Sequence, residues 1–231
     1  MPLSAKDLFF RAPHSLTDSQ GAAWDFQKPE PSTYALVASS LHLHYGSWKS
    51  GLSSKAEHAM FFCLSGPGTG KSRMLDEFPS ICRSAAESVS KRLHTVLLNA
   101  VVINVSFENG SSTATADLNY AIGARMLYQL RPKTYESMTW DLFRNDPVSQ
   151  VTAEQVVNLM LEAKSKQLSI IICVDGLHKL EHVPGSKTSP FYSRLDELAA
   201  LVNVGSSRPF VVVCVAATVN TPVKEWLGSS Q

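Results

Sequence analysis

The segment FFCLSGPGTGKS holds three glycines, a lysine and a serine directly after an apolar run. Glycine adopts positive φ angles readily, so we expect the three glycines to turn consecutive backbone N–H groups toward one point. Lysine adds a positive charge for the outer phosphates of a nucleotide, and the serine hydroxyl can bind Mg²⁺. The phosphate-binding residues that the segment predicts are Gly66, Pro67, Gly68, Thr69, Gly70, Lys71 and Ser72.

The elements expected on either side of this loop fit the same interpretation. An apolar strand over Met60–Leu64 would fix where the loop starts, and a helix beginning near Gly70 would direct the positive end of its dipole at the same anion. The strict phosphate-loop pattern G-x-x-x-x-G-K-[ST] has glycine where this chain has Ser65, which is also small. A glycine turn before a helix is the alternative, but a strand, this loop and an amphipathic helix in order favour phosphate binding.

A second apolar run, LSIIICVD, ends in Asp175 about 100 residues after the loop. An uninterrupted apolar run of this length is typical of a parallel strand that is buried on both faces. Because ligands bind at the carboxyl ends of such strands, we expect the carboxylate at the tip of a strand adjacent to the loop, where it and Ser72 would hold Mg²⁺. A plain turn aspartate is the alternative.

The residue after Asp175 is Gly176, which has no side chain to accept a proton. ATPases of the additional-strand class usually place a glutamate there to orient the attacking water, and loss of such a base slows the reaction by roughly 10²–10⁴-fold. We therefore expect a chain that binds nucleotide better than it hydrolyses it, and we assign no catalytic residue. Glu181 would replace the base only if its loop folds back.

Polar residues also follow two other apolar runs. Glu108 and Asn109 come after Thr95–Phe107, and Thr218 and Asn220 come after the run PFVVVCVAA. At the carboxyl edge of a parallel sheet such residues can sense the γ-phosphate, so Asn109, Thr218 and Asn220 are candidate sensors. Turn or helix-capping roles are the alternative for each of them.

The chain has 231 residues, 44% of them hydrophobic and 18% charged, with a net charge of +1. This size and composition predict one α/β domain with appendages, and the near-neutral charge gives no argument for binding nucleic acid or a membrane surface. No window approaches the ~20 apolar residues of a membrane span, which favours an intracellular protein. Four scattered cysteines, three of them in apolar runs, indicate reduced core residues.

We divide the chain into a loosely ordered leader over residues 1–31, a helix and linker over 32–55, and a nucleotide-binding core over 56–231 that we expect to be cut short at its C-terminus. Apolar spacing and turn residues predict the individual elements, with Pro79 opening a helix of its own. Helices are expected over residues 32–45, 71–78, 79–92, 115–130, 135–143, 152–165 and 190–202, and strands over 60–64, 95–107, 168–175 and 209–217.

Four segments carry a family resemblance: SGPGTGKSRMLDEF, VSFENGS, IGARMLY and IIICVDGLHKL. Over roughly residues 56–221 the chain resembles the NTPase domain of Crinkler-type proteins, which share ancestry with retrotransposon hot-spot proteins and are related to AAA and STAND modules. The resemblance implies a three-layer αβα P-loop NTPase with a mainly parallel central sheet, here without an evident C-terminal lid domain. It also implies ATP and Mg²⁺ as ligands, a Walker A role for Lys71 and Ser72, and a Walker B role for Asp175.

The same resemblance implies a nucleotide-dependent switch in an effector-like protein of the cytoplasm or nucleus, a host nucleus included. Its partners would be a nucleotide, a further copy of the NTPase domain, and an effector domain or protein partner, whereas nucleic-acid processing rests on the analogy alone. Asn109 would be a switch at a strand edge, and Arg125 would be structural or face a neighbouring subunit. The alternatives are an active ATPase with another water-orienting residue and a non-enzymatic interaction domain with a vestigial site.

Overall fold

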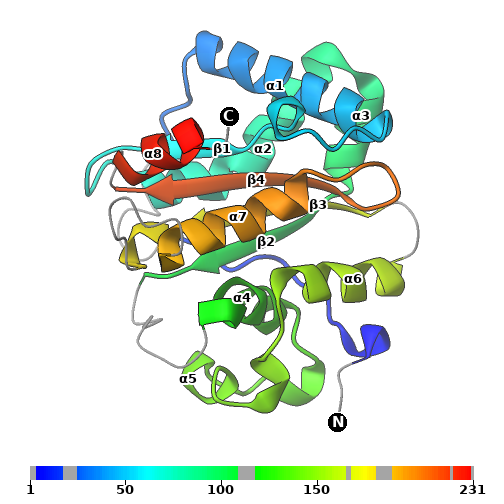
Figure 1. Cartoon of the computed structure of the whole chain (residues 1–231), viewed down its shortest axis with the longest axis vertical. Coiled ribbons are helices and arrows are strands. Elements are labelled where there is room, and N and C mark those ends of the chain that lie inside the picture. Colours follow the sequence, from blue (N-terminus) through cyan, green and yellow to red (C-terminus); the bar gives the residue numbers. More distant parts are fainter. Residues whose placement is uncertain are drawn as a thin grey trace.

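The computed structural model describes residues 4–17, 25–108, 118–164, 168–180, 189–218 and 221–229. A parallel sheet of four strands lies at the centre of this part of the chain, in the order β1-β4-β3-β2 (Figure 1). The strands are β1 (Phe61–Leu64), β2 (Val101–Ser106), β3 (Ser169–Asp175) and β4 (Phe210–Ala217). The predicted α/β class with a parallel sheet is therefore confirmed.

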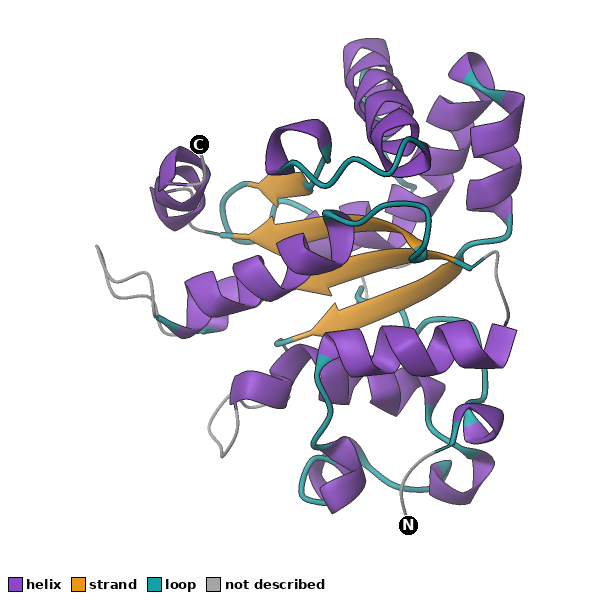
Figure 2. Ribbon diagram, turned by 45° about the vertical axis from the view of Figure 1, so that its right-hand side comes forward, coloured by secondary structure: helices purple, strands orange, loops and turns teal. Residues whose placement is uncertain are grey.

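Helices cover both faces of the sheet, which gives three layers (Figure 2). One face is covered by α1 (Pro31–Lys49), α2 (Lys71–Val89) and α3 (Lys91–Leu98). The other face is covered by α4 (Ala121–Leu130), α6 (Ala153–Lys164) and α7 (Pro190–Val202), together with the shorter α5 (Trp140–Phe143) and α8 (Thr221–Ser229). In the described ranges, none of the helices combines the length and the apolar character that crossing a bilayer demands.

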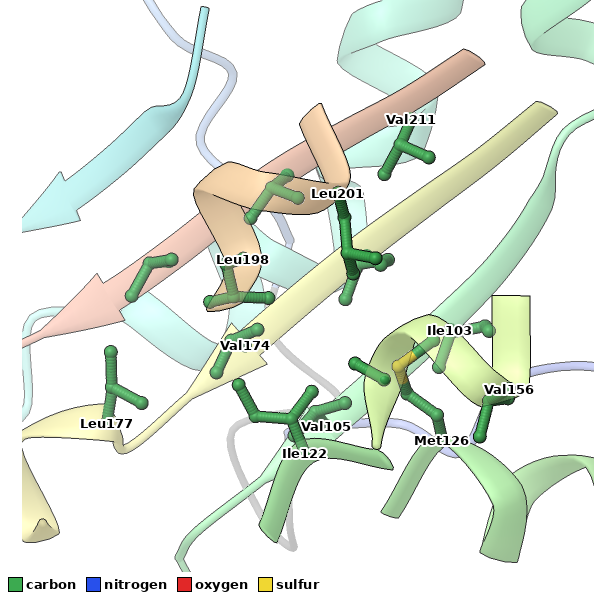
Figure 3. Close-up of a cluster of buried hydrophobic side chains, with 14 of the residues drawn as sticks. Ile103, Val105, Ile122, Met126, Val156, Val174, Leu177, Leu198, Leu201 and Val211 are labelled. Atoms are coloured by element: carbon green, nitrogen blue, oxygen red, sulfur yellow. The ribbon is translucent and has the colours of Figure 1, made fainter. Parts of the chain in front are cut away.

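The strands β3 and β4 are buried along their whole length, as their uninterrupted apolar sequences predict. Successive side chains of a strand point to opposite faces, so Ile171 and Cys173 of β3 pack under α1 and α2, while Ile172 and Val174 pack on the other side. Figure 3 shows part of this second cluster. Its labelled members include Ile103, Val105, Ile122, Met126, Val156, Leu198, Leu201 and Val211.

The helix α2 continues through Pro79, where one helix was predicted to end and a second to begin, so that prediction is wrong. Proline lacks the N–H that would bond the carbonyl four residues earlier, and in a helix interior this costs about 3 kcal/mol. The helix persists because Phe78, Ile81 and Cys82, around the proline, are buried in the core. Packing of this apolar face outweighs the local cost, and the chain first breaks after Val89.

The strand predicted over residues 95–107 is shorter than expected, because its first part is helical. Ser90 caps α3 by accepting a hydrogen bond from the N–H of Leu93 (3.2 Å), and the helix continues to Leu98. Leu93 and Leu97 are both buried while Thr95, midway between them, is exposed, which fits the four-residue spacing of a helix and not the alternation of a strand. Strand β2 starts only at Val101.

Three other helices differ from their predicted ranges, while two agree with them. The helix α1 extends to Lys49, although it was predicted to end at residue 45. The described part of α4 begins at Ala121 after a 3₁₀ turn over Leu118–Tyr120, and α5 covers only Trp140–Phe143. The helices α6 and α7 lie where they were predicted. A reciprocal pair of hydrogen bonds between Thr152 and Gln155 starts α6, as the sequence spacing indicated.

Within the range expected to be a loosely ordered leader, residues 4–17 lie against the domain. Leu8 and Leu16 are buried. The carboxylate of Asp76, on α2, accepts hydrogen bonds from the backbone N–H groups of Leu16 (2.8 Å) and Thr17 (2.9 Å). This part of the N-terminal segment is therefore attached to the helix that follows the glycine-rich loop.

Arg125 of α4 is buried between two aromatic rings. Its guanidinium carbon lies 4.2 Å from the ring centroid of Phe107 and 4.7 Å from that of Trp140, and its Nε donates to the carbonyl of Ser106 (2.8 Å). Burial lowers the pKa of Arg125 to about 10. Of the two roles considered for this residue, these contacts support the structural one.

Candidate functional site at the carboxyl edge of the sheet

The glycine-rich loop joins β1 to α2, and two of its glycines have left-handed backbones. Gly68 has a φ of 70° and Gly70 a φ of 83°, whereas Gly66, of which the same was expected, has no positive φ. Gly70 caps α2 without a side-chain hydrogen bond. The N–H groups in the first turn of an α-helix have no partner within the helix, so those of Lys71 and Ser72 are free of helical bonds at the start of α2.

Side chains of the loop bond to the carbonyl groups of the loop itself. Lys71 Nζ donates to the carbonyls of Ser65 (3.1 Å) and Gly66 (2.6 Å), and Thr69 Oγ1 donates to that of Gly66 (2.7 Å). Ser65, at the position where the strict pattern has glycine, forms a 2.6 Å hydrogen bond with Thr69 Oγ1. These bonds hold the ammonium group of Lys71 directly over the loop.

Ser72 and Asp175 come together across 103 positions of sequence. Ser72 Oγ donates to Asp175 Oδ2 at 2.6 Å. Asp175 was expected opposite Ser72, at the tip of a strand adjacent to the loop. It does lie opposite Ser72, but its strand β3 is not the neighbour of β1, because β4 lies between them. Burial and then the negative charge of Glu108 raise the pKa of Asp175, while the hydrogen bond from Ser72 acts in the opposite direction.

A cavity of about 1,160 Å³ opens over the loop and the carboxyl ends of the strands. One wall is formed by the loop, with Lys71, Ser72 and Asp175. Another wall is formed by residues 25–30, which precede α1 and include Phe26. The segment that precedes α1 therefore lines one side of the cavity, which was not predicted from the sequence.

Four further side chains line the same cavity at the strand ends: Glu108, His178, Lys179 and Thr218. Glu108 Oε1 lies 3.5 Å from His178 Nε2, and Glu108 Oε2 lies 3.4 Å from Lys179 Nζ. Thr218 Oγ1 lies 3.2 Å from His178 Nε2. Residues that follow β2, β3 and β4 thus meet at one edge of the sheet.

His178 was not among the site residues predicted from the sequence, yet it lines the cavity. Its side chain is only 18% exposed, and burial, the largest cause, lowers its pKa. The sequence signal that could have identified His178 as a site residue is its position three residues after Asp175, which ends a buried strand. Of the three candidate sensors, Thr218 lines the cavity, whereas Asn109 and Asn220 lie outside the described residues.

The donor set at this edge fits Mg²⁺. Ser72 provides a hydroxyl oxygen and Asp175 a carboxylate oxygen, and hard oxygen ligands are those that Mg²⁺ prefers. Mg²⁺ keeps several waters and needs only one or two carboxylates from a protein when phosphates supply the rest. Ser72 and Asp175 would be the protein's share of such a Mg²⁺ site beside bound phosphates.

Fold and site together define a three-layer α/β protein with a glycine-rich loop, a lysine and a carboxylate at one edge of its parallel sheet. The chain is similar to "Crinkler effector protein 108" of Phytophthora sojae, with 35% identity over 237 aligned positions. The alignment covers 96% of this chain and 28% of that protein, so the chain spans little more than a quarter of the relative's length. No family model and no solved structure matches the chain.

The similarity supports the Crinkler part of the resemblance drawn from the sequence motifs. It extends over more of the chain than residues 56–221, which carried those motifs. The name of the relative says nothing of a nucleotide or of a P-loop NTPase. The interpretation as a nucleotide-binding P-loop NTPase therefore depends on the geometry of the candidate site alone.

Proposed function

We propose that this chain binds a nucleoside triphosphate, ATP, together with Mg²⁺, and acts as a nucleotide-dependent switch. The observation that carries the proposal is the 2.6 Å hydrogen bond between Ser72 and Asp175, at the wall of a cavity that also contains Lys71 and the loop glycines. A hydroxyl and a carboxylate that meet beside a phosphate-binding loop are the protein ligands of Mg²⁺ in P-loop NTPases.

Each part of the loop has a role in this proposal. The backbone N–H groups of residues 66 and 68–72 bind the β- and γ-phosphates at the N-terminus of α2, where the helix dipole favours anions. Lys71 exchanges its carbonyl partners, Ser65 and Gly66, for phosphate oxygens, because an anion is a stronger acceptor for an ammonium group. Mg²⁺, held by Ser72 and Asp175, would neutralise charge on the phosphates.

The size of the cavity and the residues that line it support a nucleotide rather than a free phosphate. Small-molecule sites usually measure about 300–1,000 Å³, and this cavity, at about 1,160 Å³, leaves space beyond the loop for a ribose and a base. Residues 25–30 line that space, and Phe26 among them offers an aromatic ring. Aromatic rings are suitable surfaces for stacking of a base.

The similarity to a Crinkler effector protein favours a Crinkler-type domain and, with it, an effector-like role in the cytoplasm or nucleus of a host cell. A switch acts through a partner whose contacts differ between the two nucleotide states. For this chain that partner is a second copy, a further domain or another protein. Gly176 provides no proton acceptor, so any hydrolysis that resets the switch depends on another residue.

Thermal unfolding with and without nucleotide tests the proposal. ATP with Mg²⁺ at about one hundred times its dissociation constant adds roughly 2.7 kcal/mol to the stability of a protein that binds it only when folded. We expect ATP with Mg²⁺ to raise the midpoint of unfolding more than ATP alone, and GTP in parallel reports the preference for the base. Lys71→Ala should reduce the stabilisation at the same ATP concentration by at least about half, because an affinity loss of about tenfold leaves roughly 1.4 kcal/mol.

Lys91→Ala is the matched control, since Lys91 is an exposed lysine at the start of α3 and lies outside the cavity. It should retain the full nucleotide-dependent shift. If wild type shows no shift with any nucleotide, the site is vestigial and the alternative of a non-enzymatic interaction domain holds. An equal shift in wild type and Lys71→Ala would place the nucleotide elsewhere on the molecule.

A further inference from the structure

The space beside Gly176 is filled by the side chain of Glu108. Gly176 has a φ of 73°, and a Cβ built on it would lie 2.8 Å from Glu108 Cγ and 3.1 Å from Glu108 Oε1. Real Cβ atoms essentially never approach another atom this closely. The side chain of Glu108, two residues after the end of β2, therefore occupies the position next to Asp175 that a side chain at residue 176 would need.

Pairing of β2 with β3 brings this carboxylate to the site. Ser106 is the register partner of Asp175, and the N–H of Phe107 donates to the carbonyl of Asp175 at 2.9 Å. Glu108 is the next residue, so it extends past the end of the strand and lines the cavity together with Lys71 and Ser72. Ser106 and Asp175 are the last paired residues of the two strands, and Glu108 and Gly176 follow them within two residues and lie close together.

The Glu108 carboxylate is also held in place. His178 and Lys179 lie within 3.5 Å of its two oxygens, and the side chain of Glu108 remains 29% exposed. Its own backbone N–H donates to Ser106 Oγ at 3.1 Å. A carboxylate that is held by an ammonium group and an imidazole but is still open to the cavity can accept a proton from water without rearrangement of the backbone.

We infer that Glu108 is the catalytic base of this chain: it orients and deprotonates the water that attacks the terminal phosphate of ATP. This inference rests on the proposed function and replaces the expectation of weak hydrolysis with that of a working ATPase. The water oxygen forms a bond to the γ-phosphorus, and the bond from that phosphorus to the β–γ bridging oxygen breaks. The proton of the water passes to Glu108, and ADP and phosphate leave.

The first test is single-turnover hydrolysis of ATP with excess protein and Mg²⁺. Glu108→Gln has the same shape but cannot accept the proton, so it should lower the rate by roughly 10²–10⁴-fold, the usual contribution of a positioned base. ATP affinity should stay within about threefold of wild type, because the loop and the Mg²⁺ ligands are intact. Glu108→Asp, with a shorter carboxylate, should give an intermediate rate.

A second readout does not depend on turnover. ADP with aluminium fluoride mimics the phosphate in transfer together with its attacking water, so it should stabilise wild type against heat more than ADP alone does. Glu108→Gln should lose this additional stabilisation and keep the part due to ADP. Glu162→Gln, an exposed glutamate of α6 outside the cavity, is the control and should behave as wild type in both assays.

The outcomes separate the two proposals. If wild type binds ATP but does not hydrolyse it, or if Glu108→Gln hydrolyses it at the wild-type rate, the role of Glu108 is wrong and nucleotide binding stands. If wild type binds no nucleotide, the proposed function fails, and the role of Glu108 fails with it. A slow Glu108→Gln variant that binds ATP normally supports both.

Discussion

At the scale of single residues, the site depends on a contact between two short side chains on elements that are far apart in sequence. The apolar run before Asp175 and the glycines before Ser72 each predicted half of this contact. The 2.6 Å distance between them follows from the fold, since α2 runs from β1 beneath β4 and β3 and brings Ser72 near the end of β3. The motifs predicted Ser72 and Asp175 as site residues, and the arrangement of the sheet and α2 brings the two side chains together.

Asp175→Asn tests the role of this carboxylate. The amide oxygen can still accept the hydrogen bond from Ser72, but it brings no negative charge to a cation. We expect Mg²⁺ to improve ATP affinity in wild type, and this improvement to shrink by on the order of ten- to a hundredfold in the variant. Calorimetric titration with and without Mg²⁺ measures it.

Asp141→Asn is the control for that experiment, because Asp141 is an exposed carboxylate at the start of α5. It should leave the effect of Mg²⁺ unchanged. An Asp175→Asn variant that gains as much affinity from Mg²⁺ as wild type does would exclude Asp175 from the metal site.

Glu108 and His178 show what the sequence could not provide. Their proximity depends on β2 and β3 being neighbours and on Ser106 pairing with Asp175. Neither strand order nor register is encoded in the apolar pattern of a parallel strand that is buried on both faces. From the sequence, Glu108 could only be weighed as a turn residue or a polar group at a strand edge.

At the scale of elements, the strands that are wholly apolar were predicted to within one residue, as in β3 and β4. The errors fall where local and tertiary preferences oppose each other. Pro79 signals a break that core packing overrides, and the β-branched residues near Thr95 signal a strand where Ser90 starts a helix. Such conflicts are decided by burial, which a single sequence does not display.

Two glycines in helix interiors should respond in opposite ways to alanine. A Cβ on Gly123 of α4 would lie 2.0 Å from the carbonyl oxygen of Val151, whereas a Cβ on Gly46 of α1 would meet no atom within 4 Å. Alanine favours an exposed helix by about 1 kcal/mol over glycine. We expect Gly46→Ala to stabilise the fold by up to about that amount and Gly123→Ala to destabilise it by about 2 kcal/mol or more.

Urea unfolding of the two variants beside wild type measures both free energies. Similar effects from the two substitutions would contradict the close approach of α4 to the segment that precedes α6. The m-value, which is the slope of the unfolding free energy against urea concentration, serves as the control, because a change in stability alone leaves it unaltered.

At the scale of the whole molecule, α1 is fixed to the sheet by a buried histidine. His44 Nε2 donates to the carbonyl of Val211 at 2.8 Å, its Nδ1 lies 2.9 Å from His58 Nδ1, and its ring packs against Phe210. Burial, the largest cause, lowers the pKa of His44 from 6.5 to about 4. The neutral imidazole is therefore part of the folded state.

This pKa predicts that stability falls in acid. Below pH 6.5 the unfolded chain takes up a proton on His44, while the folded chain does so only near pH 4, so the contribution present above pH 6.5 is lost as the pH falls between these values. The loss from this residue is at most about 3 kcal/mol. Urea unfolding across this pH range measures the free energy of unfolding at each pH. We expect this free energy to fall less steeply with decreasing pH in His44→Gln than in wild type. His42→Gln, which changes an exposed residue of the same helix, should show the same pH dependence as wild type. The same pH dependence of stability in all three proteins would contradict the role assigned to His44.

The central claim is that the loop at the start of α2 binds the phosphates of ATP with Mg²⁺. Calorimetric titration of wild type and Lys71→Ala with ATP and Mg²⁺ tests it most directly. We predict one site per chain in wild type and a loss of at least about tenfold in affinity in the variant, since Lys71 provides a charged bond to the phosphates. Wild type that releases or absorbs no heat and shows no saturation, or a variant that binds as tightly as wild type, would contradict the claim.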